Sequence, residues 1–194
     1  MSDPRVQAAY MRALSVSLAR LGAAGERVRA ADPELFRIVA EAPRSGWLPV
    51  ALNMRWVQAV AHVYGWPDAL DFLAARVLDQ FANPLYRGLV HGGVRLLGLD
   101  PGLLVRIVPR GLSVTFRDCG AWTAVRTSRS SVELRASELP KEIASHARWL
   151  ESIGAGALAM FAVCRVQGRV RLAEHRPEAG SAVVEARWDA AGRR

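Results

Sequence analysis

Lysine, cysteine and long apolar runs are all scarce in this chain, and each scarcity excludes a class of protein. Lys141 is the only lysine among the 26 lysine and arginine residues of the 194-residue chain. The two cysteines, Cys119 and Cys164, lie far apart without a CxxC pair, which argues against a disulfide framework and a zinc finger. No run approaches the roughly 18 apolar residues of a membrane-spanning helix, and Arg12 and Arg20 interrupt the segment where a signal peptide would be apolar. We therefore expect a cytoplasmic protein with two reduced thiols.

The formal net charge is +8 and the isoelectric point is near 10.8, so arginine carries almost all of the positive charge. Arginine excess with almost no lysine is typical of a GC-rich genome, and codon usage is the explanation we prefer. Basic surfaces also attract polyanions. A nucleic-acid partner therefore stays open as an alternative.

The composition favours a globular chain, because 51% of the residues are hydrophobic and 23% are charged, far from the balance of disordered proteins. The length lies within the single-domain range. We expect one domain over residues 1–194.

Proline follows a side-chain acceptor at several points, which is the signature of a helix N-cap and first helical position. The helix starts predicted in this way, together with Pro67-Asp68, are Asp3-Pro4, Asp32-Pro33, Asn83-Pro84 and Asp100-Pro101. Apolar residues recur at helical spacing between these starts. Residues 1–118 are therefore predicted to be mostly helical, with Gly46-Trp47-Leu48-Pro49 in a loop.

The period changes after Asp118. Residues 121–126 and 132–135 predict one hairpin, and residues 170–172 and 183–188 predict a second. A helix from Pro140 to about Val163, interrupted at Gly154 and Gly156, lies between them. The predicted fold is α+β, with an N-terminal helical layer followed by a four-stranded antiparallel sheet in the order strand-strand-helix-strand-strand over residues 119–189. Residues 190–194 are expected to be a frayed tail.

No complete catalytic or metal-binding pattern is present. The histidines at 62, 91, 146 and 175 have no i,i+3 or i,i+4 spacing, and only His91 suggests a haem ligand, against the commoner hydrogen-bonded structural histidine. Gly154-Ala155-Gly156 imitates a dinucleotide fingerprint but follows a helical pattern instead of a strand, so close helix packing is the better interpretation. We expect no enzyme activity, no metal and no cofactor.

Two clusters are candidate binding surfaces. Aromatic and apolar side chains of the helical part predict a pocket, against the alternative of an ordinary aromatic core; its residues are Trp56, Val60, Tyr64, Phe72, Tyr86 and Val90. Arginines of the two hairpins predict a basic sheet face, against the alternative of a solvated face; they are Arg126, Arg135, Arg169, Arg171 and Arg187.

Several short segments are similar to an uncharacterised paralogous family of myxobacterial proteins: Trp47-Leu48-Pro49, Asn83-Pro84-Leu85, Leu97-Gly98-Leu99-Asp100-Pro101, the segment 149–156 and the segment 184–188. The order of elements resembles haem-nitric-oxide-binding sensor domains and four-vinyl-reductase small-ligand domains. The resemblance spans roughly residues 40–189. It implies the fold of these small-ligand domains.

The residues that hold haem or zinc in those families are missing from the matching positions. The proximal histidine of the haem sensors would fall after Asp100, where this chain has the segment 103–106, Leu-Leu-Val-Arg. Their Tyr-x-Ser-x-Arg motif, which holds the haem propionates, has no counterpart near residues 128–131. The zinc-binding cysteines of the four-vinyl-reductase domains have no counterpart in the last hairpin, at residues 174–180. The resemblance therefore implies neither haem nor zinc here.

Our leading hypothesis is a non-enzymatic regulatory or scaffolding domain that binds a small apolar ligand or a partner protein, with a second copy of the chain among the partners considered. The alternative is a nucleic-acid-associated protein that uses the arginine-bearing sheet face. A third hypothesis is an enzyme whose residues assemble only in the folded chain.

Overall fold

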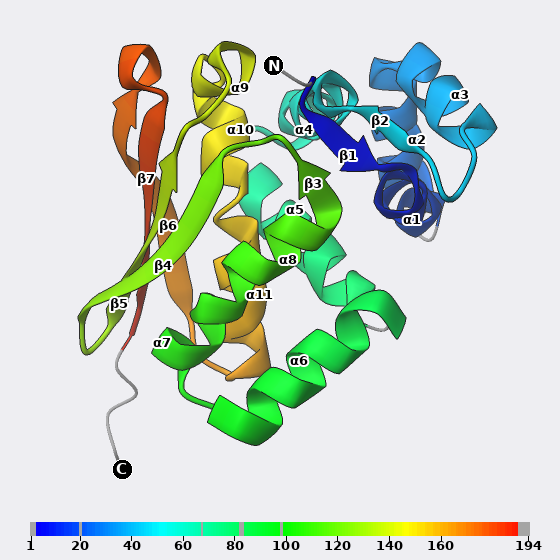
Figure 1. The fold of residues 1–194 in the computed structure, drawn as a ribbon. Coiled ribbons are helices and arrows are strands. Elements are labelled where there is room, and N and C mark those ends of the chain that lie inside the picture. Colours follow the sequence, from blue (N-terminus) through cyan, green and yellow to red (C-terminus); the bar gives the residue numbers. More distant parts are fainter. Residues whose placement is uncertain (1–2, 20, 67, 82–83, 98, 190–194) are drawn as a thin grey trace.

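Helices make up most of the chain up to residue 115, and a four-stranded antiparallel sheet with short helices makes up the rest (Figure 1). The computed structural model describes residues 3–19, 21–66, 68–81, 84–97 and 99–189. The predicted α+β class and the order strand-strand-helix-strand-strand are confirmed. The predicted tail, residues 190–194, lies outside the described residues.

The helices of the first part pack around a common apolar interior. They are α1 (Ala8–Ala19), α2 (Ala23–Ala31), α3 (Pro33–Glu41), α4 (Val50–Tyr64), α5 (Asp68–Gln80), α6 (Pro84–Leu97), α7 (Pro101–Leu104), the 3-10 turn η1 (Val105–Ile107) and α8 (Val108–Thr115).

Two predicted N-caps are confirmed by their hydrogen bonds. Asp32 Oδ1 accepts from Leu35 N at 3.1 Å, and Asp100 Oδ1 accepts from Leu103 N at 3.0 Å. Each satisfies a backbone donor that the first helical turn leaves without a partner. Asn83 and Pro67 lie outside the described residues, although α6 and α5 begin directly after them.

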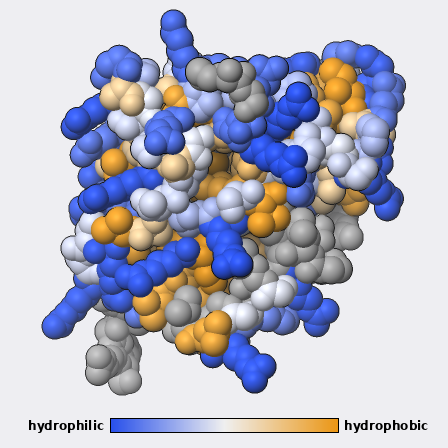
Figure 2. Space-filling view, in the orientation of Figure 1, coloured by the Kyte–Doolittle hydropathy of each residue, from blue (hydrophilic) through white to orange (hydrophobic). Residues whose placement is uncertain are grey.

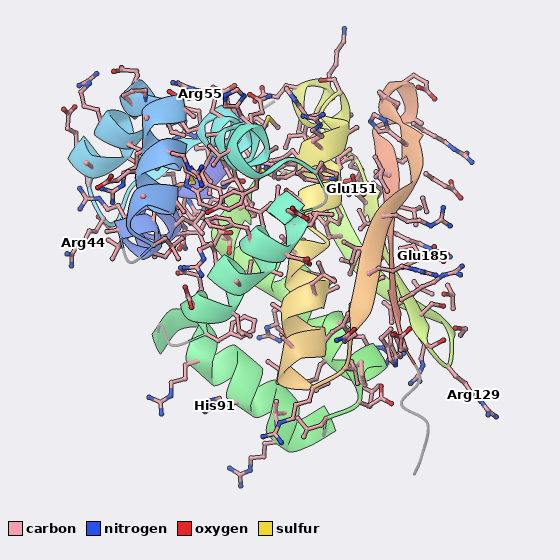
Figure 3. All side chains as sticks on the ribbon, turned by 180° about the vertical axis from the view of Figure 1, so that it is seen from behind. Arg44, Arg55, His91, Arg129, Glu151 and Glu185 are labelled. Carbon is pink, nitrogen blue, oxygen red and sulfur yellow. The ribbon has the colours of Figure 1, made fainter. Side chains whose placement is uncertain are left out.

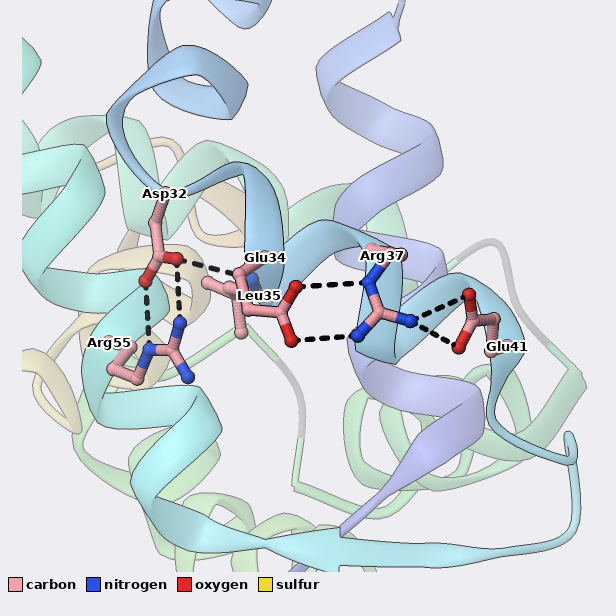
Figure 4. A network of polar contacts seen from close by, with 6 residues as sticks. All are labelled: Asp32, Glu34, Leu35, Arg37, Glu41 and Arg55. Atoms are coloured by element: carbon pink, nitrogen blue, oxygen red, sulfur yellow. Dashed lines mark hydrogen bonds and ion pairs between the residues drawn. The ribbon is translucent and has the colours of Figure 1, made fainter.

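Asp32, which caps α3, also forms an ion pair with α4 (Figure 4). Arg55 of α4 donates to both carboxylate oxygens of Asp32, at 2.8 and 2.7 Å. These hydrogen bonds lower the pKa of Asp32 below its ordinary value of 3.8. On the exposed side of α3, Arg37 bridges Glu34 and Glu41, where ion pairs contribute little because water screens them.

The helix start predicted at Asp3-Pro4 is wrong, and so is the loop predicted at Trp47-Leu48-Pro49. Asp3-Pro4 leads directly into the strand β1 (Arg5–Gln7), and Trp47-Leu48-Pro49 is the strand β2 (Trp47–Pro49). With β3 (Phe116–Arg117) these strands form a small antiparallel sheet in the order β2-β1-β3. Val6 pairs with Leu48 on one side and with Phe116 on the other. Such pairings join residues far apart in the sequence, and no local pattern reports them.

The larger sheet has the strand order β4-β5-β7-β6. Its strands are β4 (Ala121–Ser128), β5 (Ser131–Ser137), β6 (Gly168–Arg176) and β7 (Ser181–Trp188), and the 3-10 turn η2 (Pro177–Ala179) joins the last two. Alternate residues of the central strands, Val132, Leu134, Val184 and Ala186, are fully buried on the inner face. Figures 1 and 3 show the described helices on this face only.

Short helices connect the two hairpins and cover the inner face: α9 (Lys141–Ala144), α10 (Ala147–Ser152) and α11 (Ala155–Val163). Glycines set the approach of α11. A Cβ on Gly154 would lie 2.9 Å from the Val170 side chain, and a Cβ on Gly156 would lie 3.1 Å from that of Val108. The interpretation of these glycines as close packing positions is confirmed. No helix within the described ranges is long and apolar enough to cross a membrane.

Candidate functional site: a cavity between the helical layer and the last helices

A cavity of about 110 Å³ lies between the helical layer and the helices that cover the sheet. Its walls come from α1, α4, α5, α8 and α11, with η1, β3 and α10 at the sides. Most of the lining is apolar, including Leu14, Val57, Leu73, Ile153 and Met160. Residues from position 10 to position 160 thus surround one space, which no single segment could form.

Polar side chains on the wall are mostly satisfied by the protein itself. Asn53 Oδ1 accepts from Trp149 Nε1 at 2.8 Å, and Asn53 Nδ2 contacts Met11 Sδ at 3.3 Å. Thr115 Oγ1 donates to Gly111 O at 2.8 Å. The two contacts of Asn53 also hold α4 against α10 and α1.

Two polar side chains of the wall are exceptions. The Nε1 of Trp56 is buried without an acceptor in the part of the chain that the structure describes, and the whole residue is 1% exposed. Gln80 is 6% exposed, and its carboxamide has no hydrogen-bond partner among the described residues. An unpaired buried donor costs about 1–3 kcal/mol, and such groups are rare enough in native proteins to call for an explanation.

The predicted pocket residues lie together in part. Trp56 lines the cavity. Val60 is fully buried in the hydrophobic core and is not among the lining residues. Tyr64 and Phe72 stack with ring centroids 4.6 Å apart, and Phe72 lies 6.3 Å from Trp56. Neither of these two rings lines the cavity. The side chains of Tyr86 and Val90, on α6, lie outside what the structure describes.

The predicted basic residues do not share one face. Arg135, Arg169, Arg171 and Arg187 alternate onto the outer face of the sheet. Arg126 pairs in register with the buried Val132, and therefore lies on the inner side at the sheet edge. There its guanidinium contacts Asp100 at 3.4 Å and lies 5.9 Å from the Trp188 ring centroid.

Glutamates neutralise much of the charge on the outer face. Glu185 accepts from Arg171 at 2.7 Å and forms an ion pair with Arg187 at 2.6 Å, and Figure 3 shows it pointing away from the helices. Burial opposes ionisation of Glu185, but the hydrogen bonds from Arg187 and Arg171 outweigh it and lower the pKa. Arg135 pairs with Glu133. Arg169 has no ion pair within the described part of the chain.

The cysteines and histidines lie away from the cavity. Burial raises the pKa of the Cys119 thiol to about 12 and that of Cys164 to about 11, so neither is a ready nucleophile. His175 contacts Ala144 O at 2.6 Å. His91 is exposed beside an apolar surface groove formed with Leu78, Phe81, Val94, Arg95, Leu99 and Val163.

The cavity does not fit a haem group. No histidine, cysteine or arginine is among its lining residues in the described part of the chain, so an axial nitrogen or thiolate ligand and a partner for the propionates are both missing. An apolar cavity of about 150 Å³ holds one benzene ring. A porphyrin is built from several such rings, and the observed space is smaller still.

Figure 2 shows one face of the molecule, which is mainly hydrophilic in its upper part. Hydrophobic side chains gather on its lower part, around the position of α6 and α7 in Figure 1. Leu96 and Leu99 are 84% and 60% exposed. Within the described ranges, no three histidine, cysteine, aspartate or glutamate side chains come close enough to hold a metal ion.

Asn53, Gln80, Trp149 and Met160 were not among the predicted site residues. Asn53 and Gln80 are polar residues at positions of α4 and α5 where the helical pattern expects apolar ones. A polar residue at such a position is the signal in the sequence that could have indicated them. Met160 reads as an ordinary residue of an apolar helix. Only the packing of α11 against α5 brings it to the cavity.

Comparisons with known proteins identify the fold. No family model matches the chain, and no curated protein matches it in sequence, so the resemblance to a myxobacterial family has no support. The Fe(II) unliganded H-NOX protein from K. algicida superposes with a TM-score of 0.57 at 10% identity, over 95% of this chain and 96% of that one. The S. oneidensis H-NOX protein in the Fe(II)NO ligation state gives 0.58 at 14% identity, over 94% and 99%. A mutant of T. Tengcongensis H-NOX gives 0.59 at 8%, over 94% and 97%. This chain therefore has an H-NOX-like fold.

Proposed function

We propose that this chain is a non-enzymatic regulatory domain whose cavity binds a small, largely apolar ligand. The observation that carries the proposal is the cavity itself, because it lies between two layers of the fold and is lined mostly by apolar side chains. Close packing is the rule in protein interiors. A space of this size is therefore a binding site of the kind that holds benzene or xenon in other proteins.

The H-NOX-like fold supports the same proposal. The S. oneidensis protein of this fold is described in an Fe(II)NO ligation state, so it holds a small ligand. In our chain none of the described residues on the cavity wall is of a kind that would hold haem. We propose that the ligand occupies the cavity directly.

Binding in this cavity gives the ligand a physical means of regulating the domain. A ligand that binds only the folded state stabilises that state in proportion to its concentration over its dissociation constant. Phe81 lines both the cavity and the apolar surface groove beside His91. A displacement of Phe81 at the cavity wall would therefore also change the shape of the surface groove. A partner protein bound in that groove would respond to this change.

The nucleic-acid alternative has less support. Four of the five predicted arginines form ion pairs with carboxylates, and Arg126 lies on the other side of the sheet. Arginines already paired with glutamate release fewer counterions from a polyanion.

Thermal unfolding in the presence of 2-methyl-1-butene tests the proposal, because this apolar molecule is small enough for the cavity. We expect the unfolding midpoint of the wild-type protein to rise with ligand concentration. Ala155→Leu adds carbon atoms at the cavity wall and should abolish the rise. Ala162→Leu makes the same change at an exposed position of the same helix and should respond like the wild type.

A midpoint that stays constant in both the wild type and Ala162→Leu would contradict the proposal. An equal rise in Ala155→Leu would also contradict it, because the ligand would then bind elsewhere.

A further inference from the structure

The indole of Trp56 is almost fully buried and has no hydrogen-bond acceptor among the described residues. Trp149 Nε1 donates to Asn53 at 2.8 Å, Trp66 Nε1 to Glu151 at 3.0 Å and Trp122 Nε1 to Cys119 O at 3.2 Å. Trp56 is 1% exposed and lines the cavity, yet no described residue accepts from its Nε1. Buried indole donors normally find a partner, so the absence of one within the described ranges calls for an explanation.

Gln80 adds a second polar group to the same wall. Its carboxamide, on α5, is without a hydrogen-bond partner in the described part of the chain. A carboxamide can both donate and accept. The cavity therefore combines an apolar lining with polar side chains on α4 and α5 for which the described residues provide no hydrogen-bond partner.

The lining also limits the charge of an occupant. None of the described residues that line the cavity is acidic, basic or histidine. Taking an ion out of water without an opposite charge is strongly unfavourable. The occupant is therefore neutral.

Building on the proposed function, we infer that the ligand is a neutral molecule of about four to six non-hydrogen atoms with a carbonyl or hydroxyl oxygen, and that Trp56 Nε1 donates a hydrogen bond to that oxygen. The apolar part of the ligand fills the space beside Val57, Leu73 and Met160. The Gln80 carboxamide provides a second hydrogen bond to the same polar end. Short ketones, aldehydes and alcohols belong to this chemical class.

Two probe ligands of the same shape separate the hydrogen bond from simple filling of the cavity. 2-Butanone and 2-methyl-1-butene differ by a carbonyl oxygen in place of a methylene group. Because the alkene leaves water more readily than the ketone, each affinity is compared between the wild type and Trp56→Phe, not between the two ligands. Trp56→Phe removes the donor and keeps an aromatic side chain.

We expect Trp56→Phe to weaken 2-butanone binding by about 2- to 10-fold, the range for one hydrogen bond, and to leave 2-methyl-1-butene binding within about 2-fold. Trp66→Phe is the matched control, because the Trp66 indole already donates to Glu151 away from the cavity. It should leave the relative affinity for the two ligands unchanged.

Nuclear magnetic resonance of the wild type gives a reading that does not depend on the variant folding. The Trp56 Nε1–H proton, assigned through bonds, should move downfield when 2-butanone is added, and should lack this downfield change with 2-methyl-1-butene. An unmoved proton at saturating ketone, or an equal loss of both affinities in Trp56→Phe, would overturn the inference while leaving the proposed function intact. If neither probe binds the wild type, the proposed function fails with it.

Discussion

At the scale of residues, buried polar side chains join the helical layer to the segment that covers the sheet. Asn53 and Trp149 are 96 positions apart in the sequence, and both are nearly fully buried. Trp66 reaches Glu151 in the same way. A satisfied polar pair fixes the position of α10 on α4 more narrowly than apolar contact does.

Asn53→Leu should lower the free energy of unfolding by about 1–3 kcal/mol, because it leaves the Trp149 indole donor buried without a partner. Urea denaturation measures this loss. Trp149→Phe should cost less in the Asn53→Leu background than in the wild type, since the donor is then no longer needed. Strictly additive losses would show that the two side chains do not act as a pair.

The Asp32–Arg55 pair predicts a dependence of stability on pH. Hydrogen bonds from Arg55 lower the pKa of Asp32 in the folded state below 3.8, so the ionised carboxylate stabilises the fold. This contribution is fully present above the unfolded value and is lost as the pH falls through the folded value.

Asparagine keeps the helix cap but not the charge. Asp32→Asn should therefore be less stable than the wild type at neutral pH by up to about 1 kcal/mol, and the difference should shrink as the pH falls below 3.8. Urea unfolding at a series of pH values measures both proteins. Arg55→Gln is the companion variant, because it keeps the cap hydrogen bond to Leu35 and removes the cation. A constant difference across the pH series would show that the ion pair contributes nothing.

At the scale of elements, local chemistry predicted the helices and the hairpins but missed the pairing between distant segments. The caps at Asp32 and Asp100 depend only on neighbouring residues, so the sequence was enough to find them. β1 is three residues long, and its two partners lie more than 40 and more than 100 positions away. Its existence depends on tertiary packing, which local propensity does not contain.

The cavity was only partly predictable for the same reason. Trp56 was identified from its place among the aromatic residues, but its neighbours Ile107 and Met160 come from other elements. The alternation of β4 places Arg126 on the inner side, because it pairs with the buried Val132. The basic-face prediction had grouped it with the outer arginines, since a hairpin pattern alone does not fix which residues share a face.

Glycine in α2 gives a prediction about element packing. A Cβ on Gly25 would lie 1.9 Å from the Leu18 carbonyl oxygen of α1, so Gly25→Ala must push the two helices apart. We expect a loss of stability of about 1–3 kcal/mol, measured by urea denaturation. Gly88→Ala is the control on α6, where a Cβ meets nothing within 4 Å, and it should be neutral or stabilising by up to about 1 kcal/mol. Equal effects of the two changes would contradict the close approach of α1 and α2.

At the scale of the whole molecule, the chain keeps an H-NOX-like fold at sequence identities of 8–14% to solved H-NOX structures. One continuous hydrophobic core includes residues of the helical layer and of the four-stranded sheet. Most residues that line the cavity belong to this core or pack against it. The fold thus supplies a small apolar space whose described lining has no residue that would hold haem, and it places the Trp56 indole donor on the wall of that space.

A crystal structure under xenon pressure tests the central claim most directly, because xenon enters small apolar cavities and its electron density marks them. We expect one xenon atom beside Val57, Leu73 and Met160 in the wild-type protein, and none there in Ala155→Leu. A wild-type crystal with no xenon between these side chains would contradict the claim that the interior of this domain is a ligand site.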